Sequence, residues 1–355
     1  MNKDKTKKLL LENFKRYPKM TSEDVFKLIY QSAYGCEHMV SSLQMAEERI
    51  INEVRELSGV SATPLIEPLG KNYSRVSLDY LSLGLSASTL AKLFVLSAKK
   101  EENGGDRLKE MITVACELVS QKELPLDKKE FDCALLSWEQ NGFAPIHHSN
   151  EFRCEYHPAY RVISNDFVRF LPLFAEIDRR LENGSLTVAI EGGCGSGKTT
   201  LSSLISKIYD ANIFHIDDFF LQPEQRTPER MKEVGGNFDK ERFILEVMLP
   251  HSQGKSVEYK RFDCTTRAVL EGKTIEPRNL TVIEGVYSMH PELQGFYDLG
   301  VFLDISPELQ KERILKRNSK GMATRFFDEW IPLENMYFEK MNIKDKCALQ
   351  IFIDK

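Results

Sequence analysis

The sequence of 355 residues lacks any apolar run close to the roughly 18–20 residues that a membrane span needs. Its Leu-Leu-Leu run at residues 9–11 is also too short for the apolar core of a secretory signal. Cysteine is sparse: the seven residues are scattered, odd in number and without a Cys-x-x-Cys pair. A disulfide framework is therefore not expected. These absences predict a cytoplasmic protein with reduced thiols and no membrane partner.

An excess of positive charge is also missing. Lysine and arginine number 48 against 53 aspartate and glutamate residues, which gives a net charge of −5. The charge balance therefore provides no general reason to expect a nucleic-acid partner. Hydrophobic residues make up 42% and charged residues 28%, as in globular proteins, and the length suits two domains. The sequence leaves open whether the chain forms a homo-oligomer.

Two different patterns divide the chain near residue 165. Residues 1–165 predict a mostly helical α(+β) domain, with a helix capped by Thr21 or Ser22 and amphipathic segments around 42–57 and 88–100. Residues 67–81 favour a short strand or loop, and 141–162, rich in His, Tyr, Arg and Pro, favour irregular structure. From residue 166 a helix precedes short apolar strands that alternate with loops and helices. This alternation predicts an α/β domain over 166–355, built on a parallel sheet with flanking helices.

The stretch "EGGCGSGKTT" at 191–200 satisfies the pattern G-x-x-x-x-G-K-[ST] of a phosphate-binding loop (P-loop). A predicted strand precedes it and a predicted helix follows it, as this loop requires. Its glycines let backbone N–H groups surround phosphate oxygens, and the helix N-terminus faces the same anions. The predicted nucleotide-binding residues are Gly192, Gly193, Cys194, Gly195, Ser196, Gly197, Lys198, Thr199 and Thr200. Because no Asn-Lys-x-Asp motif that reads guanine follows, ATP is favoured over GTP.

Carboxylates stand where several of the predicted strands end. Asp217 and Asp218 lie in "FHIDDFF", Glu284 in "TVIEGVY" and Asp304 in "VFLDIS". Ligands of open α/β sheets bind beyond these strand ends. An ordinary polar strand end is the alternative for each residue, and Asp304 could simply cap the following helix. Asp217 and Glu284 are the favoured functional pair, because phosphoryl transfer needs a carboxylate for the acceptor hydroxyl and one for the metal.

Taken in order, "GGCGSGKTT", "HIDDFF", "GGNFDKERF", "VIEGVYSMHPEL" and "YDLGVFLDISPELQKERILKRN" resemble the uridine kinase-like P-loop kinases. That superfamily also includes phosphoribulokinase and pantothenate kinase. The resemblance covers about residues 185–355. It implies a P-loop fold, an activity that uses ATP and Mg²⁺, and a small-molecule phosphoryl acceptor.

The resemblance also implies roles for individual residues. Asp217 matches the general base that faces the acceptor hydroxyl, and Lys198 the lysine that binds the outer phosphates. Glu284 matches the metal-associated carboxylate, which together with Thr199 and Asp217 gives the expected metal set. Asp239 matches the aspartate that holds ribose hydroxyls. The lid arginines correspond to Arg313 and Arg317, for which a solvated helix face is the alternative.

The acceptor side departs from the uridine kinase pattern. In "VEYKRFDCTTR", Tyr259, Phe262 and Arg267 are candidates to match the pyrimidine-reading stretch, but its histidine has no counterpart. Phe220 stands where those kinases have an aromatic residue with a hydroxyl. Sites built to hydrogen-bond a base discriminate strongly against substrates that leave those groups unpaired. The expected acceptor is therefore a nucleoside or another riboside, without a commitment to uridine.

The first 165 residues contain no motif that points to a particular activity. Their His-, Arg- and Tyr-rich stretches suit anion or sugar recognition, or hydrogen-bonded loops packed between helices. We predict that the front domain contributes acceptor contacts through Arg153, His157, Tyr160 or Arg161; the alternative is that these residues only stabilise the domain junction. For the whole chain, the alternative to a kinase is a nucleotide-sensing module whose front domain binds a protein partner.

Overall fold

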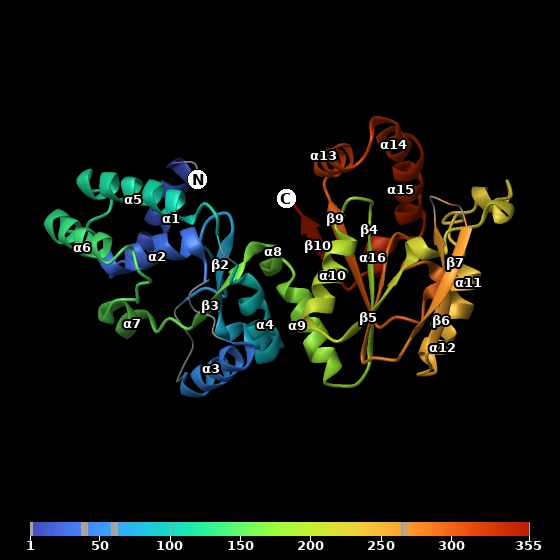
Figure 1. The fold of residues 1–355 in the computed structure, drawn as a ribbon, viewed down its shortest axis with the longest axis horizontal. Coiled ribbons are helices and arrows are strands. Elements are labelled where there is room, and N and C mark those ends of the chain that lie inside the picture. Colours follow the sequence, from blue (N-terminus) through green and yellow to red (C-terminus); the bar gives the residue numbers. More distant parts are fainter. Residues whose placement is uncertain are drawn as a thin grey trace. The chain divides into compact units, whose positions relative to one another are not determined.

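The computed structural model describes residues 3–36, 42–57, 63–99, 101–263, 266 and 268–354. The chain divides into two compact units, Met1–Asp178 and Arg179–Lys355. Figure 1 shows the helix-rich first unit in blue to green and the second unit, with its central sheet, in green to red.

The front unit is mostly helical, as predicted. Its helices are α1 (Lys3–Arg16), α2 (Ser22–Tyr34), α3 (Leu43–Glu56), α4 (Ala87–Ser97), α5 (Gly104–Ser120), α6 (Lys128–Gln140), α7 (Asn150–Tyr156) and α8 (Asn165–Val168). Thr21 is the N-cap of α2 and forms a reciprocal capping box with Asp24. Of the two caps that the sequence left open, Thr21 is therefore the one used.

A small antiparallel sheet completes the front unit. Its order is β1 (Ile66–Pro68), β2 (Tyr73–Ser77) and β3 (Tyr160–Ser164). The prediction of a strand within 67–81 is confirmed, whereas that of irregular structure over 141–162 is wrong. Ser149 caps α7 by accepting a hydrogen bond from the Phe152 N–H, and β3 is held by pairing with β2. That pairing joins segments about 90 residues apart (Ser74 with Ile163), so local composition could not reveal it.

The division between the units falls after Asp178, later than the expected position at residue 165. Two helices, α8 and α9 (Leu171–Leu181), replace the single helix expected there. Pro172, which lacks an N–H, stands in the first turn of α9, a position that proline tolerates. Asp178 accepts hydrogen bonds from the Ser86 N–H and the Thr89 hydroxyl, which ties most of α9 to the front unit.

The second unit is built on the predicted parallel sheet. Its strands are β4 (Leu186–Gly192), β5 (Ala211–His215), β8 (Leu280–Glu284), β9 (Leu299–Ile305) and β10 (Leu349–Ile353), in the order β10-β9-β4-β8-β5. The P-loop strand β4 is central, and all seven of its residues are buried. A buried parallel strand explains its nearly continuous apolar sequence.

Helices and one antiparallel hairpin surround this sheet (Figure 1). The helices are α10 (Lys198–Ile208), α11 (Lys240–Phe243), α12 (Leu249–Ser252), α13 (Pro307–Arg317), α14 (Lys320–Arg325), α15 (Ile331–Lys340) and α16 (Ile343–Lys346). The hairpin pairs β6 (Val257–Asp263) with β7 (Ala268–Ile275). No helix in the described ranges is long and apolar enough to cross a membrane.

Strand periodicity separates the two faces of the sheet. Ala189, Ile283 and Phe214 are cross-strand neighbours and share a buried cluster with Tyr337 of α15. Glu191, two residues after Ala189, points to the same face. Glu284 follows Ile283 and therefore points to the other face, where α10 packs against the sheet. The sheet thus places one acidic residue on each side of the P-loop.

Candidate functional site

The P-loop connects β4 to α10 through glycines with positive φ. Gly192 has a φ of 145°, and a Cβ there would lie 2.6 Å from the Leu303 carbonyl oxygen. Gly197 has a φ of 99° and is the N-cap of α10. Both conformations are disfavoured for residues with a side chain. The glycines of the motif are therefore required by the backbone path as well as by its expected ligand.

Polar side chains of the P-loop itself and of α13 donate hydrogen bonds to carbonyl oxygens of the loop. The Lys198 ammonium donates to the carbonyl oxygens of Gly192 and Gly193, at 2.6 and 3.1 Å. From α13, Arg313 donates to the Gly195 carbonyl at 3.0 Å, and Gln310 donates to the Cys194 carbonyl at 2.9 Å. The predicted lid residue Arg313 therefore contacts the P-loop directly. The second, Arg317, is exposed, and its guanidinium lies 5.8 Å from the Phe326 ring centroid.

Glu284 stands at the end of β8, where three elements meet. Its Oε1 accepts a hydrogen bond from the Thr199 hydroxyl of α10 at 3.1 Å. The same oxygen lies 2.6 Å from Nδ1 of His215, its direct neighbour on β5. The hydrogen bond to Glu284 raises the pKa of His215. Thr199 and Glu284, predicted to share a metal, are thus brought together, while His215 was not predicted.

Asp217 and Asp218 follow β5 in a short 3₁₀ turn, Ile216–Phe219. Asp217 remains accessible to solvent, yet the surrounding protein desolvates its carboxyl and raises its pKa, and the negative charge of Glu284 adds to this effect. The nearby Lys198 opposes it. Asp218 instead accepts a hydrogen bond from the Tyr259 hydroxyl at 3.2 Å. The two aspartates therefore differ in environment: Asp217 faces the P-loop charges, and Asp218 the β6–β7 hairpin.

The loop and its neighbours fit phosphate groups and a hard cation. The Ser196 hydroxyl is buried and has no hydrogen-bond partner within the described part of the chain. Thr199 and Glu284 provide the oxygen ligands that Mg²⁺ prefers, and Mg²⁺ commonly uses only one or two carboxylates together with phosphate oxygens. The described residues contain no group of three or more His, Cys, Asp or Glu side chains able to hold a metal by themselves.

Two buried glutamates at the P-loop were missed by sequence reasoning. Glu334 of α15 accepts a hydrogen bond from the Cys194 N–H at 2.8 Å. Glu191 accepts from the Gly192 N–H at 3.0 Å and from the Tyr337 hydroxyl at 3.1 Å. Burial raises the pKa of both carboxyls, that of Glu191 to about 7. The sequence did contain a signal for Glu191, because a glutamate is unusual in a buried, mostly apolar strand such as β4. The residues around Glu334 contain no comparable signal.

Residues predicted to bind the acceptor lie close together around the 3₁₀ turn. Asp239 is buried as the N-cap of α11, and one of its oxygens accepts a hydrogen bond from Gln225 at 3.0 Å. Phe220 forms an isolated bridge with Phe238, and Tyr259 stacks on Phe219 with centroids 5.2 Å apart. The described contacts give Asp239 a structural role. Its role toward ribose stays a prediction.

The remaining predicted residues are placed as follows. Arg267 lies outside the described residues. His157 ends α7 with a φ of 43°, and Arg161 of β3 binds both carboxylate oxygens of Glu53 at 2.8 and 2.9 Å. The Arg161 contacts are internal to the front unit and agree with a structural role. A contribution of His157 or Arg161 to acceptor binding stays a prediction.

A parallel sheet with a P-loop after its central strand and carboxylates at the neighbouring strand ends defines a P-loop kinase fold. Residues 187–326 match the phosphoribulokinase/uridine kinase family, so the chain contains a domain of this family. The match includes the P-loop, Asp217, Glu284 and the arginines of α13. The front unit, which ends at Asp178, lies wholly outside it.

Several known proteins are similar to parts of this chain. A uridine kinase from Macrococcus caseolyticus is 26% identical over 171 residues, which are 43% of this chain and 81% of that protein. A uridine kinase from Limosilactobacillus reuteri (strain DSM 20016) is 27% identical over 153 residues, 39% of this chain and 66% of that protein. A solved structure described as a possible uridine kinase from Bacillus stearothermophilus has 21% identity and a TM-score of 0.39, covering 47% of this chain and 89% of that one.

Proposed function

We propose that the chain catalyses ATP- and Mg²⁺-dependent transfer of a phosphoryl group to a hydroxyl of a small, sugar-containing metabolite. The observation that supports this most is the grouping at the end of the P-loop. Thr199 and Glu284 are hydrogen-bonded, and the accessible Asp217 carboxyl interacts electrostatically with both Lys198 and Glu284. A metal-binding pair, a phosphate-binding lysine and a separate carboxylate are the parts that such a transfer needs.

In this mechanism each residue has one task. Bound ATP with Mg²⁺ supplies the transferable phosphoryl group. The loop N–H groups and Lys198 stabilise negative charge on the phosphates, and Thr199 and Glu284 hold the metal. Asp217 orients the acceptor hydroxyl and accepts its proton as the new bond to phosphorus forms and the bond between that phosphorus and the ADP leaving group breaks. Arg313 and Arg317 stabilise the charge that develops during transfer.

The acceptor class follows from the neighbourhood of Asp217 and from the relatives. The curated relatives above are named uridine kinases, which favours a nucleoside or another riboside. Phe220 lacks a hydroxyl, and the Tyr259 hydroxyl is bound to Asp218. Because these aromatic residues offer few free polar groups for a base, we propose a riboside acceptor without assigning its base.

An acceptor screen tests the proposal. Full-length protein is incubated with ATP and Mg²⁺ together with nucleosides, other ribosides or polyols, and ADP release is measured. We expect one riboside to raise ADP release well above the hydrolysis background. If ATP binds but no acceptor class raises turnover, the kinase proposal fails and the nucleotide-sensing alternative gains.

Replacing Glu334, one of the two buried glutamates at the P-loop, should alter the affinity for ATP. In Glu334→Gln the amide oxygen can still accept from the Cys194 N–H, so the loop keeps its shape, but a negative charge beside the expected phosphate site is lost. We expect ATP to bind roughly tenfold more tightly, which corresponds to about 1.4 kcal/mol. Isothermal titration calorimetry with ATP measures the change.

The matched control is Glu339→Gln, on the same helix but exposed, which should leave the affinity unchanged. If Glu334→Gln weakens ATP binding instead, the carboxylate supports the nucleotide-binding form of the loop rather than competing with phosphate.

A further inference from the structure

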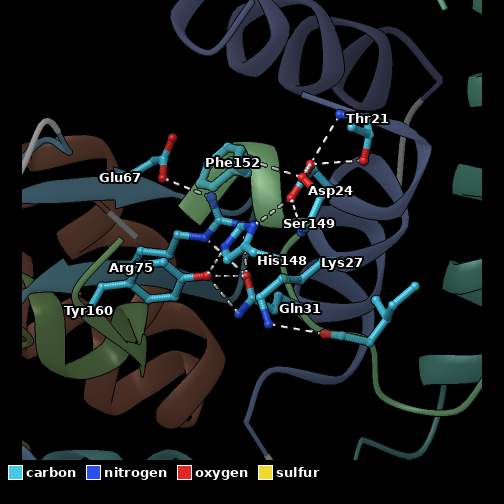
Figure 2. Close-up of polar contacts among 11 residues, drawn as sticks. Thr21, Asp24, Lys27, Gln31, Glu67, Arg75, His148, Ser149, Phe152 and Tyr160 are labelled. Carbon is cyan, nitrogen blue, oxygen red and sulfur yellow. Dashed lines mark hydrogen bonds and ion pairs between the residues drawn. The ribbon is translucent and has the colours of Figure 1, made fainter. Parts of the chain in front are cut away.

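The front unit contains a second polar centre, a group of interacting polar side chains. Its residues are far from the P-loop motif in the sequence and belong to a different compact unit. Figure 2 shows it between α2 and the β1–β3 sheet, an interface that would ordinarily be apolar. Its buried members share charge or strong hydrogen-bonding capacity: Asp24, Lys27, Gln31, Glu67, Arg75, His148 and Ser149. The half-buried Tyr160 belongs to the same network.

One part of this centre is a chain of hydrogen bonds. Nδ1 of His148 lies 2.8 Å from the Asp24 carboxylate, and its Nε2 lies 2.7 Å from the Tyr160 hydroxyl. Asp24 also accepts from the Ser149 hydroxyl at 2.7 Å. Burial lowers the pKa of His148 to about 3, so the imidazole is neutral, donating to Asp24 and accepting from Tyr160. Asp24 is therefore fully engaged by neutral donors.

The guanidinium of Arg75 is also held on several sides. It binds Glu67, its cross-strand neighbour, at 3.0 Å. It donates twice to the Gln31 side-chain oxygen, at 3.0 and 2.8 Å, and lies 4.8 Å from the Tyr160 ring centroid. The N–H groups of the guanidinium thus already donate hydrogen bonds to Glu67 and Gln31.

Lys27 differs from the other members because its donors are not matched. It lies one helical turn before Gln31 and is only 9% exposed. Its ammonium makes one hydrogen bond, to the Ile146 carbonyl at 3.0 Å, and the described residues offer no ion pair to it. Burial lowers the pKa of Lys27 to about 8, and the positive charges of Arg75 and Arg153 add to this effect, whereas the negative charge of Asp24 opposes it. A buried cation with two unmatched N–H groups costs stability unless an anion can bind there.

We propose that Lys27 is the centre of a binding site for the phosphate group of a small molecule, a site separate from the P-loop. Lysine is a common phosphate ligand because it acts as a point charge, whereas the arginine fork of Arg75, which suits carboxylate and phosphate alike, is already occupied. Arg153, exposed on α7, provides a second cation whose charge acts on Lys27. Ile146, whose carbonyl binds Lys27, and Tyr160 are only half-buried. Bound phosphate relieves the repulsion among the three cations.

The test uses the full-length protein and a reporter confined to the front unit. The chain has two tryptophans, Trp138 and Trp330. Trp138 stacks on Phe26, the residue before Lys27, with centroids 5.0 Å apart. In a Trp330→Phe background, tryptophan fluorescence therefore follows unfolding of the front unit. Inorganic phosphate and glycerol 3-phosphate are added in separate arms, with chloride at matched ionic strength as the reference.

We expect phosphate at ten times its Kd to raise the melting temperature of the Trp138 transition by about 3–6 °C. Lys27→Met should abolish this shift, while Lys109→Met, an exposed lysine on α5, should retain it. Lys198→Ala should also retain it, because the P-loop is not involved. A larger shift with glycerol 3-phosphate would identify a phosphate ester rather than the free ion as the ligand.

Three outcomes would overturn the proposal: no shift in either arm, an equal shift in Lys27→Met, or loss of the shift in Lys198→Ala. If Lys27→Met does not fold, Arg153→Met keeps the test open, because this side chain is exposed and can be removed without opening the core. It should weaken phosphate binding severalfold, and unchanged binding would count against the site. None of these results depends on whether the second unit phosphorylates a riboside.

Discussion

Asp217→Asn should lower phosphoryl transfer by a factor on the order of 10²–10⁴ while leaving ATP binding largely intact. The amide is nearly the same size as the carboxyl but cannot accept the acceptor's proton. Asp217 is the accessible carboxyl that interacts electrostatically with Lys198 and Glu284, and it is not part of the P-loop that we propose to bind the nucleotide. Turnover with the acceptor identified by the screen and calorimetry with ATP measure the two effects separately.

Asp218→Asn is the matched control for this prediction. Asp218 accepts a hydrogen bond from Tyr259, so its replacement should disturb the β6–β7 hairpin and lower turnover less. Residual activity that is higher in Asp217→Asn than in Asp218→Asn would show that the wrong aspartate has been assigned as the base.

The second large effect is expected for Lys198→Ala. The ammonium is the only side-chain cation within the P-loop motif, and it also ties together the carbonyl oxygens of Gly192 and Gly193. Its removal should reduce turnover by on the order of 10²-fold or more, because charge on the transferring phosphates loses its preorganised partner. Steady-state kinetics with saturating ATP and acceptor provide the measurement.

Lys207→Ala, an exposed lysine on the same helix, is the control and should retain normal turnover. Circular dichroism should show both variants folded. Wild-type activity in a folded Lys198→Ala protein would contradict the assignment of the loop as the site of phosphate binding.

Local sequence was enough to predict the P-loop and the strand-end carboxylates. Gly192 and Gly197 adopt backbone conformations that only glycine takes readily. The glycines of this short motif therefore already indicate the path of the loop backbone. Strands β4 and β8 are buried and mostly apolar, and β5 is mostly buried, so the sequence shows where these strands end and thereby locates Asp217 and Glu284. The parallel sheet followed from the same alternation of apolar strands and helices.

Tertiary structure alone decided which side chains meet these residues. Glu334 reaches Cys194 across 140 residues, Tyr337 reaches Glu191 across 146, and His148 reaches Asp24 across 124. His215 meets Glu284 because the register of β5 against β8 places them side by side. Such partners depend on how helices and strands pack. A single sequence does not show which segments far apart along the chain lie close together in space. The sequence by itself therefore determined the backbone of the P-loop, and the fold determined which buried charges surround it.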